Sequence, residues 1–375
     1  MDLLELRKEL DGIDRQLIQL LEERLKVCGQ VAEYKIETGK PVFDKEREQQ
    51  KIASVRELSH GLFHKQAAEE LFTQLMTISR RYQYQILKQH GAHTDTGFAM
   101  VDGFLKEKAR VVYQGVEGAY SHGAALQYFG ETAQMYHVKT WEEAMTEVEL
   151  GRADYAVIPI ENSSAGAVSD NYDLLIRHDN VIVAETFLPV NHALLGLPGA
   201  SLQDIQVVYS HPQALMQCSQ YLNAHRDWKQ ISVENTAVSA KKVIEDQDIH
   251  QAAVASQVAG DLYGLSVLAQ EINHNRENTT RFIILARDKV YRKDAKKISI
   301  CFELPHKIGS LYNILGNFIY NGVNMVMIES RPILGRNWEY RFFVDIEGNL
   351  SDVPVQNALK SISEEAANVR ILGNY

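Results

Sequence analysis

Two basic residues on one apolar helix face are the first feature of the sequence that could take part in chemistry. Arg24 occupies a position where the alternating three- and four-residue spacing of apolar side chains calls for another apolar one. A buried guanidinium is costly unless it is paired or binds an anion. Lys35 follows about three helical turns later and points nearly the same way. The spacing therefore predicts an anion site. Taken singly, each cation could instead be a surface charge, a salt bridge or a device that fixes helix register.

The element that must position both cations is one long amphipathic helix, predicted from residue 3 to about residue 38. It ends at Thr38-Gly39-Lys40-Pro41, where glycine can cap it and proline cannot continue it. At 1.5 Å per residue this helix is about 54 Å long, too long to be covered within its own block, so we expect a homodimer or higher homo-oligomer. In a dimer Arg7, rotated by about 100° from Arg24, would reach the site from the partner chain. The apolar positions are Leu3, Leu6, Leu10, Ile13, Leu17, Leu20, Val27 and Val31.

Two shorter helices are expected to complete this site. Asp44 is a plausible N-cap of the second helix, whose first turn carries Arg47 and Glu48. The third helix runs from about residue 64 to residue 89. On its inward face Ser79 and Gln83 lie four residues apart among apolar neighbours.

These residues resemble the site of the all-helical chorismate mutase family, and the resemblance covers the block of residues 1–90. The rearrangement of chorismate is pericyclic, so the site has to hold a dianion in a compact shape and stabilise charge on the breaking ether oxygen. The resemblance implies that Arg7 and Arg24 hold the carboxylates, with Arg47 in support. It also implies that Lys35 and Gln83 donate to the ether oxygen as the catalytic residues, while the two acidic residues orient the ring hydroxyl and a cation. The matching residues are Arg7, Arg24, Lys35, Asp44, Arg47, Glu48, Ser79 and Gln83.

The middle of the chain alternates short apolar runs with helical stretches, which predicts an α/β domain. Four segments at strand ends carry its polar residues: Gly115–Ser121, Glu161–Ser164, Ser210–Leu215 and Thr279–Phe282. The first is glycine-rich and offers free backbone N–H groups and a helix start, suited to a carboxylate or phosphate. The second lies where open α/β sheets place ligands. The alternatives are a structural turn, helix N-caps and a structural histidine.

Together these four segments resemble the prephenate dehydratase family, over residues 109–287. The most specific parts are Glu161-Asn162-Ser163-Ser164-Ala165-Gly166 and Thr280-Arg281-Phe282. The resemblance implies two α/β subdomains with the site in the cleft between them, in a fold similar to periplasmic binding proteins. The first subdomain would take residues 109–188 and return at about 275–287, and the second would take residues 189–274.

The same resemblance gives Thr280 a central catalytic role. A threonine hydroxyl is a poor general acid, so we expect it to donate a hydrogen bond to the departing hydroxyl. Arg281 would either hold a substrate carboxylate or brace the loop, and Glu161 is a candidate for proton transfer. The expected substrate-binding residues are Ser121, Glu161, Asn162, Ser163, Ser164, His211, Gln213, Thr280, Arg281 and Phe282.

Residues 297–375 are predicted to run strand, helix, strand, strand, helix, strand, the order of a ferredoxin-like α+β domain. The segments Ile308-Gly309-Ser310-Leu311-Tyr312 and Glu329-Ser330-Arg331-Pro332 resemble the two motifs of the ACT family of amino-acid-binding regulatory domains. Gly309 opens a helix at a loop, where the backbone of a ligand can approach closely. The resemblance implies an allosteric phenylalanine site, and the alternative is a dimerisation domain without ligand. The expected residues are Gly309, Ser310, Leu311, Asn324, Glu329 and Ser330.

Composition limits the partners. The chain has 39 Lys and Arg against 49 Asp and Glu, a formal charge of −10, which argues against nucleic acid or an anionic membrane. The three cysteines are scattered, so we expect no disulfide framework, and we expect no metal site and no cofactor. Neither a signal peptide nor an apolar stretch of about 18 residues is present, so the expected location is the cytoplasm. Residues 91–108 and 287–297 are predicted to be a linker and a solvated connector.

The three resemblances together imply a multidomain, bifunctional enzyme of phenylalanine biosynthesis, an isomerase and a lyase under feedback inhibition by phenylalanine. A mutase joined to a prephenate dehydrogenase is rejected, because no Gly-x-Gly dinucleotide fingerprint occurs. A non-enzymatic amino-acid sensor is disfavoured by Thr280-Arg281-Phe282 and by the mutase residues. Arogenate in place of prephenate stays open.

Overall fold

The computed structural model of the chain describes residues 2–90, 95–105 and 107–375. These residues divide into two compact units. The first unit holds the N-terminal helices together with residues 312–323 and 351–366, which carry most of α11 (Ser310–Tyr320) and α12 (Val353–Glu365). The second unit holds residues 96–311, 324–350 and 367–375, and with them every strand of the described chain.

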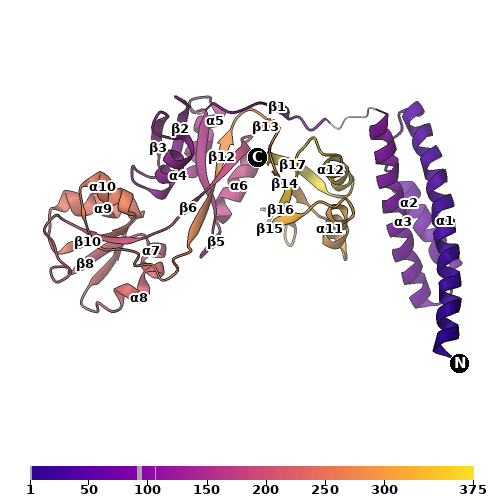
Figure 1. The fold of residues 1–375 in the computed structure, drawn as a ribbon, viewed down its shortest axis with the longest axis horizontal. Helices are drawn as coiled ribbons and strands as arrows, with labels where there is room; N and C mark the ends of the chain where they lie inside the picture. Colours follow the sequence, from indigo (N-terminus) through magenta and orange to yellow (C-terminus); the bar gives the residue numbers. More distant parts are fainter. Residues whose placement is uncertain (1, 91–94, 106) are drawn as a thin grey trace. The chain divides into compact units, whose positions relative to one another are not determined.

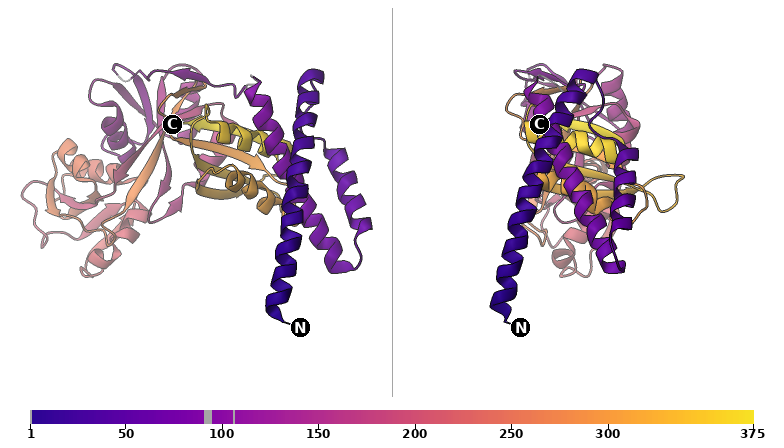
Figure 2. Two further views of the ribbon diagram at one scale, coloured as in Figure 1. Left: turned by 45° about the vertical axis from the view of Figure 1, so that its right-hand side comes forward. Right: turned by 90° about the vertical axis from the view of Figure 1, so that its right-hand side faces the viewer.

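The N-terminal block forms the three predicted helices, α1 (Leu3–Thr38), α2 (Lys45–Leu58) and α3 (Leu62–Gln89). The predicted end of α1 is confirmed, because Gly39 caps it in the left-handed conformation (φ +68°) that glycine adopts without steric cost. Asp44 caps α2 as predicted, and its carboxylate accepts a hydrogen bond from Arg47 N at 3.0 Å. α1 and α3 lie side by side in each view (Figure 1, Figure 2).

The apolar stripe of α1 is exposed within one chain. Leu10, Leu17 and Leu20 are 58%, 53% and 61% exposed, and Ala32 is the one buried residue along the helix, all of which is described. Because a helix gains most of its stability from burying an amphipathic face, this stripe calls for a second surface. It is therefore available for the shared seam that the sequence predicts.

The larger sheet of the second unit has ten strands in the order β15-β16-β14-β17-β6-β12-β4-β2-β3, with β5 paired to β4. Figure 1 shows β6 and β12 running along its middle. Its strands are β2 (Arg110–Gln114), β3 (Gln134–Val138), β4 (Tyr155–Asn162), β5 (Gly166–Ala167), β6 (Val181–Pro189), β12 (Thr279–Ala286), β14 (Lys297–Glu303), β15 (Met325–Pro332), β16 (Tyr340–Glu347) and β17 (Ala367–Asn374).

A second sheet, in the order β11-β7-β10-β8-β9, lies between β6 and β12 along the chain. The chain leaves the larger sheet after Pro189 and returns at Thr279, which confirms the two predicted subdomains. The strands are β7 (Ala193–Gly196), β8 (Val207–Ser210), β9 (Lys229–Ser232), β10 (Gln251–Ala255) and β11 (Ser266–Ala269). The helices of the two subdomains are α4 (Tyr120–Phe129), α5 (Trp141–Glu149), α6 (Ser169–Arg177), α7 (Pro212–Gln217), α8 (Ser219–Leu222), α9 (Thr236–Asp246) and α10 (Gln257–Tyr263).

The C-terminal block follows the predicted order, β14, α11, β15, β16, α12, β17. Its four strands are antiparallel to their neighbours in the order β15-β16-β14-β17, the ferredoxin-like arrangement.

The two predicted connecting segments are in part structured, and this corrects the prediction. Ala99–Val101 forms β1 and Val290–Arg292 forms β13, and the two strands pair in parallel. Strands of three residues are too short to show an alternating pattern, so their sequences resemble loops. Residues 91–94 and 106 of the predicted linker lie outside the described residues.

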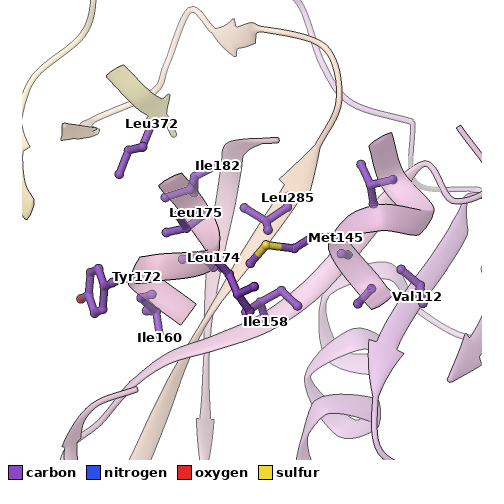
Figure 3. Close-up of a cluster of buried hydrophobic side chains, with 14 of the residues drawn as sticks. Val112, Met145, Ile158, Ile160, Tyr172, Leu174, Leu175, Ile182, Leu285 and Leu372 are labelled. Atoms are coloured by element: carbon purple, nitrogen blue, oxygen red, sulfur yellow. The ribbon is translucent and has the colours of Figure 1, made fainter. Parts of the chain in front are cut away.

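One close backbone contact joins the C-terminal strands to the rest of the larger sheet. Gly373 of β17 pairs with Ile182 of β6, and a Cβ at position 373 would lie 2.0 Å from the carbonyl oxygen of Ile182. The neighbouring core contains buried side chains from both sides of this join, among them Leu175, Ile182 and Leu372 (Figure 3). Only a residue without a side chain fits at this point of the sheet.

We expect Gly373→Ala to destabilise the second unit by about 1–3 kcal/mol, because the added methyl forces β17 away from β6. At about 2–4 °C per kcal/mol for domains of this size, the midpoint of thermal unfolding should fall measurably. Gly103→Ala is the matched control, since a Cβ there meets no atom within 4 Å. Equal midpoints for the two variants would contradict the tight join.

Candidate active sites

The first candidate site lies where α1 meets α3. Arg24 is half-buried, and its Nη1 donates to the Ser79 hydroxyl and, at 3.2 Å, to the carbonyl oxygen of Leu75. Ser79 is 5% exposed. The structure thus brings together Arg24 and Ser79, two of the predicted residues. Both the Ser79 hydroxyl and the Leu75 carbonyl are neutral partners of the guanidinium.

Lys35 lies one turn before the end of α1, close to the start of α2. Its Nζ donates to the carbonyl oxygen of Val42 at 2.6 Å. Burial lowers the pKa of Lys35, and the nearby carboxylates of Asp44 and Glu48 oppose this shift. Lys35, Asp44 and Glu48 are three more of the predicted residues, and their charges therefore interact with one another.

Gln83 contributes an unused hydrogen-bonding group. The residue is 7% exposed, and its side-chain oxygen is buried without a hydrogen-bond partner among the described residues. Leaving such a group unsatisfied costs about 1–3 kcal/mol, which a bound molecule with a matching polar group would remove. Gln83 lies one helical turn after Ser79 on α3, as the sequence predicts.

Arg7 and Arg47 do not join this cluster within one chain. Both are exposed, and Arg7 lies about 25 Å along α1 from Arg24 at 1.5 Å per residue. A cavity of about 340 Å³ beside α2 and α3 is lined by Glu48 but by none of the other seven predicted residues. The predicted residues therefore do not line this cavity as a group, and Arg7 does not meet Arg24 within one chain.

Arg80 is a residue of this region that the sequence analysis missed. It is 6% exposed, pairs with Glu48 at 2.6 Å, and its guanidinium lies 5.0 Å from the ring centre of Phe43. The signal was available, because Arg80 lies three and four residues before Gln83 and Tyr84, which are also buried.

The second candidate site lies at the ends of β4 and β12, which place Asn162 opposite Thr280. The Asn162 amide donates to Thr280 Oγ1 at 2.9 Å. The amide oxygen of Asn162 accepts from the backbone N–H groups of Ser164 and Ala165, both at 3.0 Å. These two contacts fix the direction of the amide, so the Thr280 oxygen accepts one hydrogen bond and its own proton is free for another partner.

The serines of the same loop are tied to the segment that leads into β12. Ser163 Oγ accepts from Thr279 N at 2.9 Å, and Ser164 Oγ accepts from the Asn275 amide at 2.8 Å. Both serines are exposed. The loop after β4 and the start of β12 are thus held together around Thr280.

Phe282 needs a correction as a predicted substrate contact. It is 1% exposed and lies in a hydrophobic core cluster with Tyr113 and Ile284, because alternate residues of β12 point into that core. Glu161, by contrast, is half-buried and lies 4.0 Å from the Arg281 guanidinium.

The glycine-rich turn is not the open cradle that the sequence predicts. Gly115 N donates to Val138 O at 3.0 Å and Gly118 N to His122 Nδ1 at 3.1 Å, so these N–H groups are used inside the protein. A Cβ at Gly118 would lie 3.2 Å from Ala259 of α10, so the turn packs against the second subdomain. Ser121 follows inside α4 and is 7% exposed.

His211 and Gln213 form a helix cap. The His211 ring accepts from Gln213 N at 3.3 Å at the start of α7, and burial lowers the pKa of His211. This contact supports the structural alternative for the histidine.

A polar chain between the subdomains was missed by the sequence analysis. His192, 2% exposed, lies between β6 and β7, where the chain crosses from one subdomain to the other. Its Nδ1 lies 3.0 Å from the Tyr120 hydroxyl and its Nε2 lies 3.0 Å from the Gln217 side-chain oxygen. Burial lowers the pKa of His192, in keeping with a neutral ring. No sequence signal singles out this histidine, because its partners are 72 and 25 residues away.

No helix within the described ranges is long and apolar enough to cross a membrane.

Comparison with known proteins gives both sites a family. Residues 6–84 match the family model described as chorismate mutase type II, and residues 111–290 match the one described as prephenate dehydratase. The bifunctional chorismate mutase/prephenate dehydratase of Escherichia coli (strain K12) is 34% identical over 100% of this chain and 96% of its own length. An Arabidopsis thaliana chloroplastic arogenate dehydratase/prephenate dehydratase is 41% identical over 72% of each chain.

A solved structure is also similar. The prephenate dehydratase of Arthrobacter aurescens in complex with L-phenylalanine is 31% identical, with a TM-score of 0.66, over 71% of this chain and 89% of its own. The chain carries both enzymes, and it belongs to the family of bifunctional chorismate mutase/prephenate dehydratases.

Proposed function

We propose that the chain rearranges chorismate to prephenate at Arg24, Lys35 and Gln83, converts prephenate to phenylpyruvate at Thr280, and is inhibited by phenylalanine at the C-terminal block. The observation that carries the second step is the oriented hydrogen bond from Asn162 to Thr280. The cytoplasmic location predicted from the sequence is part of this proposal.

In the mutase step, Arg24 has the charge to hold a carboxylate, because its hydrogen-bond partners are neutral. Lys35 and Gln83 then donate to the ether oxygen, where negative charge grows as the C–O bond breaks. Arg7 from a second chain binds the other carboxylate of the substrate. The exposed apolar stripe of α1 supports that dimer, since it offers a surface that a second copy would bury.

We expect Lys35→Ala to lower mutase kcat by about 100-fold or more, since one preorganised donor to a developing oxyanion is worth that much. Prephenate formation from chorismate is the measurement, and dehydratase activity should be unchanged. Lys26→Ala, which removes an exposed cation from the same helix, is the matched control. Normal turnover by Lys35→Ala would refute its role.

In the dehydratase step, prephenate loses carbon dioxide and its ring hydroxyl. The electron pair of the breaking C–C bond enters the ring, and the ring hydroxyl departs with its bonding pair as hydroxide, which then takes up a proton from water. Thr280 donates its free proton as a hydrogen bond to the departing oxygen, while Asn162 stabilises the Thr280 oxygen from the other side. Ser163 and Ser164, in the loop after β4, are the neighbouring groups that would complete the site, whereas Glu161 lies beside Arg281.

Thr280→Ala should reduce dehydratase kcat by about 100-fold or more and leave mutase activity intact. Thr280→Ser, which keeps the hydroxyl, should retain most of the rate. Thr279→Ala is the matched control, because the Thr279 hydroxyl donates only to Glu277 O at 3.2 Å. The test is phenylpyruvate formation from prephenate, and loss of both activities in Thr280→Ala would indicate misfolding instead.

The substrate of this second site is proposed to be prephenate, and the Arabidopsis relative is named for arogenate as well. The two substrates differ in a keto or an amino group. Comparison of kcat/KM for the two molecules decides between them.

Regulation by phenylalanine is proposed from the C-terminal motifs. Gly309 has φ +80° in an exposed loop, and Glu329 and Ser330 lie on β15. The Arthrobacter relative, solved with L-phenylalanine, supports this ligand. Asn324 donates to Glu347 at 3.1 Å, so its amide already has one partner in the protein.

A coupled assay tests the three proposals together. Supplied with chorismate, the enzyme should form phenylpyruvate, and millimolar phenylalanine should suppress it. Formation without suppression would remove the regulatory proposal and leave both enzymes. Accumulation of prephenate would remove the proposed dehydratase site.

A further inference from the structure

Arg281 lies next to Thr280 but faces away from it. Successive side chains of a strand point to opposite faces. Thr280 Oγ1 meets Asn162 of β4, whereas the Arg281 guanidinium meets Glu185 of β6 and two residues of the C-terminal block. The Arg281 side chain is 9% exposed.

The contacts of Arg281 close into a ring. Its Nη2 donates to the Tyr375 hydroxyl at 2.8 Å and pairs with Asp345 Oδ2 at 2.7 Å. Ser299 lies between the two, with its hydroxyl 2.7 Å from that of Tyr375 and hydrogen-bonded to the other Asp345 oxygen. In such a ring each hydroxyl donates once and accepts once, and Asp345 Oδ2 meets the guanidinium as an ion pair.

The charge of Arg281 is already balanced by the protein. Its Nε donates to Glu185 at 2.7 Å, and Asp345, with a side chain 3% exposed, supplies a second carboxylate. Lys297 pairs with the other Glu185 oxygen, and Glu161 lies 4.0 Å from Arg281 Nη1, so two cations face three carboxylates. A substrate carboxylate would have to displace one of these partners to bind Arg281.

We infer that Arg281 is a positioning residue that anchors the strand of Thr280 to the C-terminal sheet and does not bind the substrate. This rests on the dehydratase reaction proposed above. Ser299, Asp345 and Tyr375 come from β14, from β16 and from the residue after β17, so a shift of those elements is passed to β12 through the ring. Since a misplacement of about 1 Å can cost 100-fold in rate, the C-terminal sheet thereby controls the second active site.

The test uses the full-length enzyme with prephenate as substrate. Tyr375→Phe opens the ring without removing a charge, and Asp345→Asn removes one of the two carboxylates. Both should lower dehydratase kcat by about 10-fold or more and leave KM within about twofold, because the loss falls on the geometry of the transition state. The retained KM for prephenate shows that the second unit is folded, and mutase activity should equal that of the wild type because its residues lie in the first unit.

Asp173→Asn is the matched control. It weakens another ion pair of the C-terminal strands, Arg331 of β15 with Asp173 of α6 at 2.7 Å, without touching β12. Its kcat should stay at the wild-type value. A fall in the kcat of Asp173→Asn equal to that of Tyr375→Phe would overturn the inference. Any weakening of contacts with the C-terminal strands would then be enough to slow the dehydratase.

A double-mutant cycle separates positioning from substrate binding. Arg281→Lys combined with Tyr375→Phe should be little slower than the slower single variant, since both break one ring. If the two substitutions lowered kcat independently, so that the double variant lost the product of the two factors, the inference would be overturned. A rise in KM with unchanged kcat in Arg281→Lys would likewise overturn it and indicate that Arg281 binds the substrate. A wild-type enzyme that does not consume prephenate would instead contradict the proposed function.

Discussion

The alternation of side chains along β12 is the constraint on which the second active site depends. One residue, Thr280, faces the loop after β4, and its neighbour Arg281 faces the C-terminal strands. Phe282, the next residue, is buried in the hydrophobic core and so holds β12 in place within the sheet. Because the three side chains belong to consecutive residues of one strand, a shift of that strand moves all three together. The motif thus combines the proposed catalytic hydroxyl of Thr280, the ion pairs of Arg281 and the core contact of Phe282.

A different constraint governs the N-terminal helices. There the polar residues are held by helix packing, and the long helix α1 exposes most of its apolar stripe. Within one chain Arg24 and Ser79 already meet, whereas Arg7 lies about 25 Å away along the helix. In the dimer proposed above, a second chain would cover the stripe and bring its own Arg7 to the site.

Local signals in the sequence predicted local structure well. Gly39 and Asp44 were identified as caps because capping depends on residues within one turn. Asn162 and Thr280 were identified as site residues through motifs, but their hydrogen bond joins residues 118 positions apart and depends on strand register. His192 was missed for the same reason. The glycine-rich turn was misjudged because its glycines serve close packing against α10, a contact that no local pattern encodes.

Arg24 and Arg281 differ in the charge of the groups that surround their guanidinium groups. A buried guanidinium has to recover the cost of desolvation from its partners. Arg24 has Ser79 and a backbone carbonyl, both neutral, so its positive charge is left for an anionic ligand. Arg281 has Glu185 and Asp345, and its charge is cancelled inside the protein. Sequence patterns rank both residues alike as candidates for a carboxylate, and only the sum of the charges around each one separates their roles.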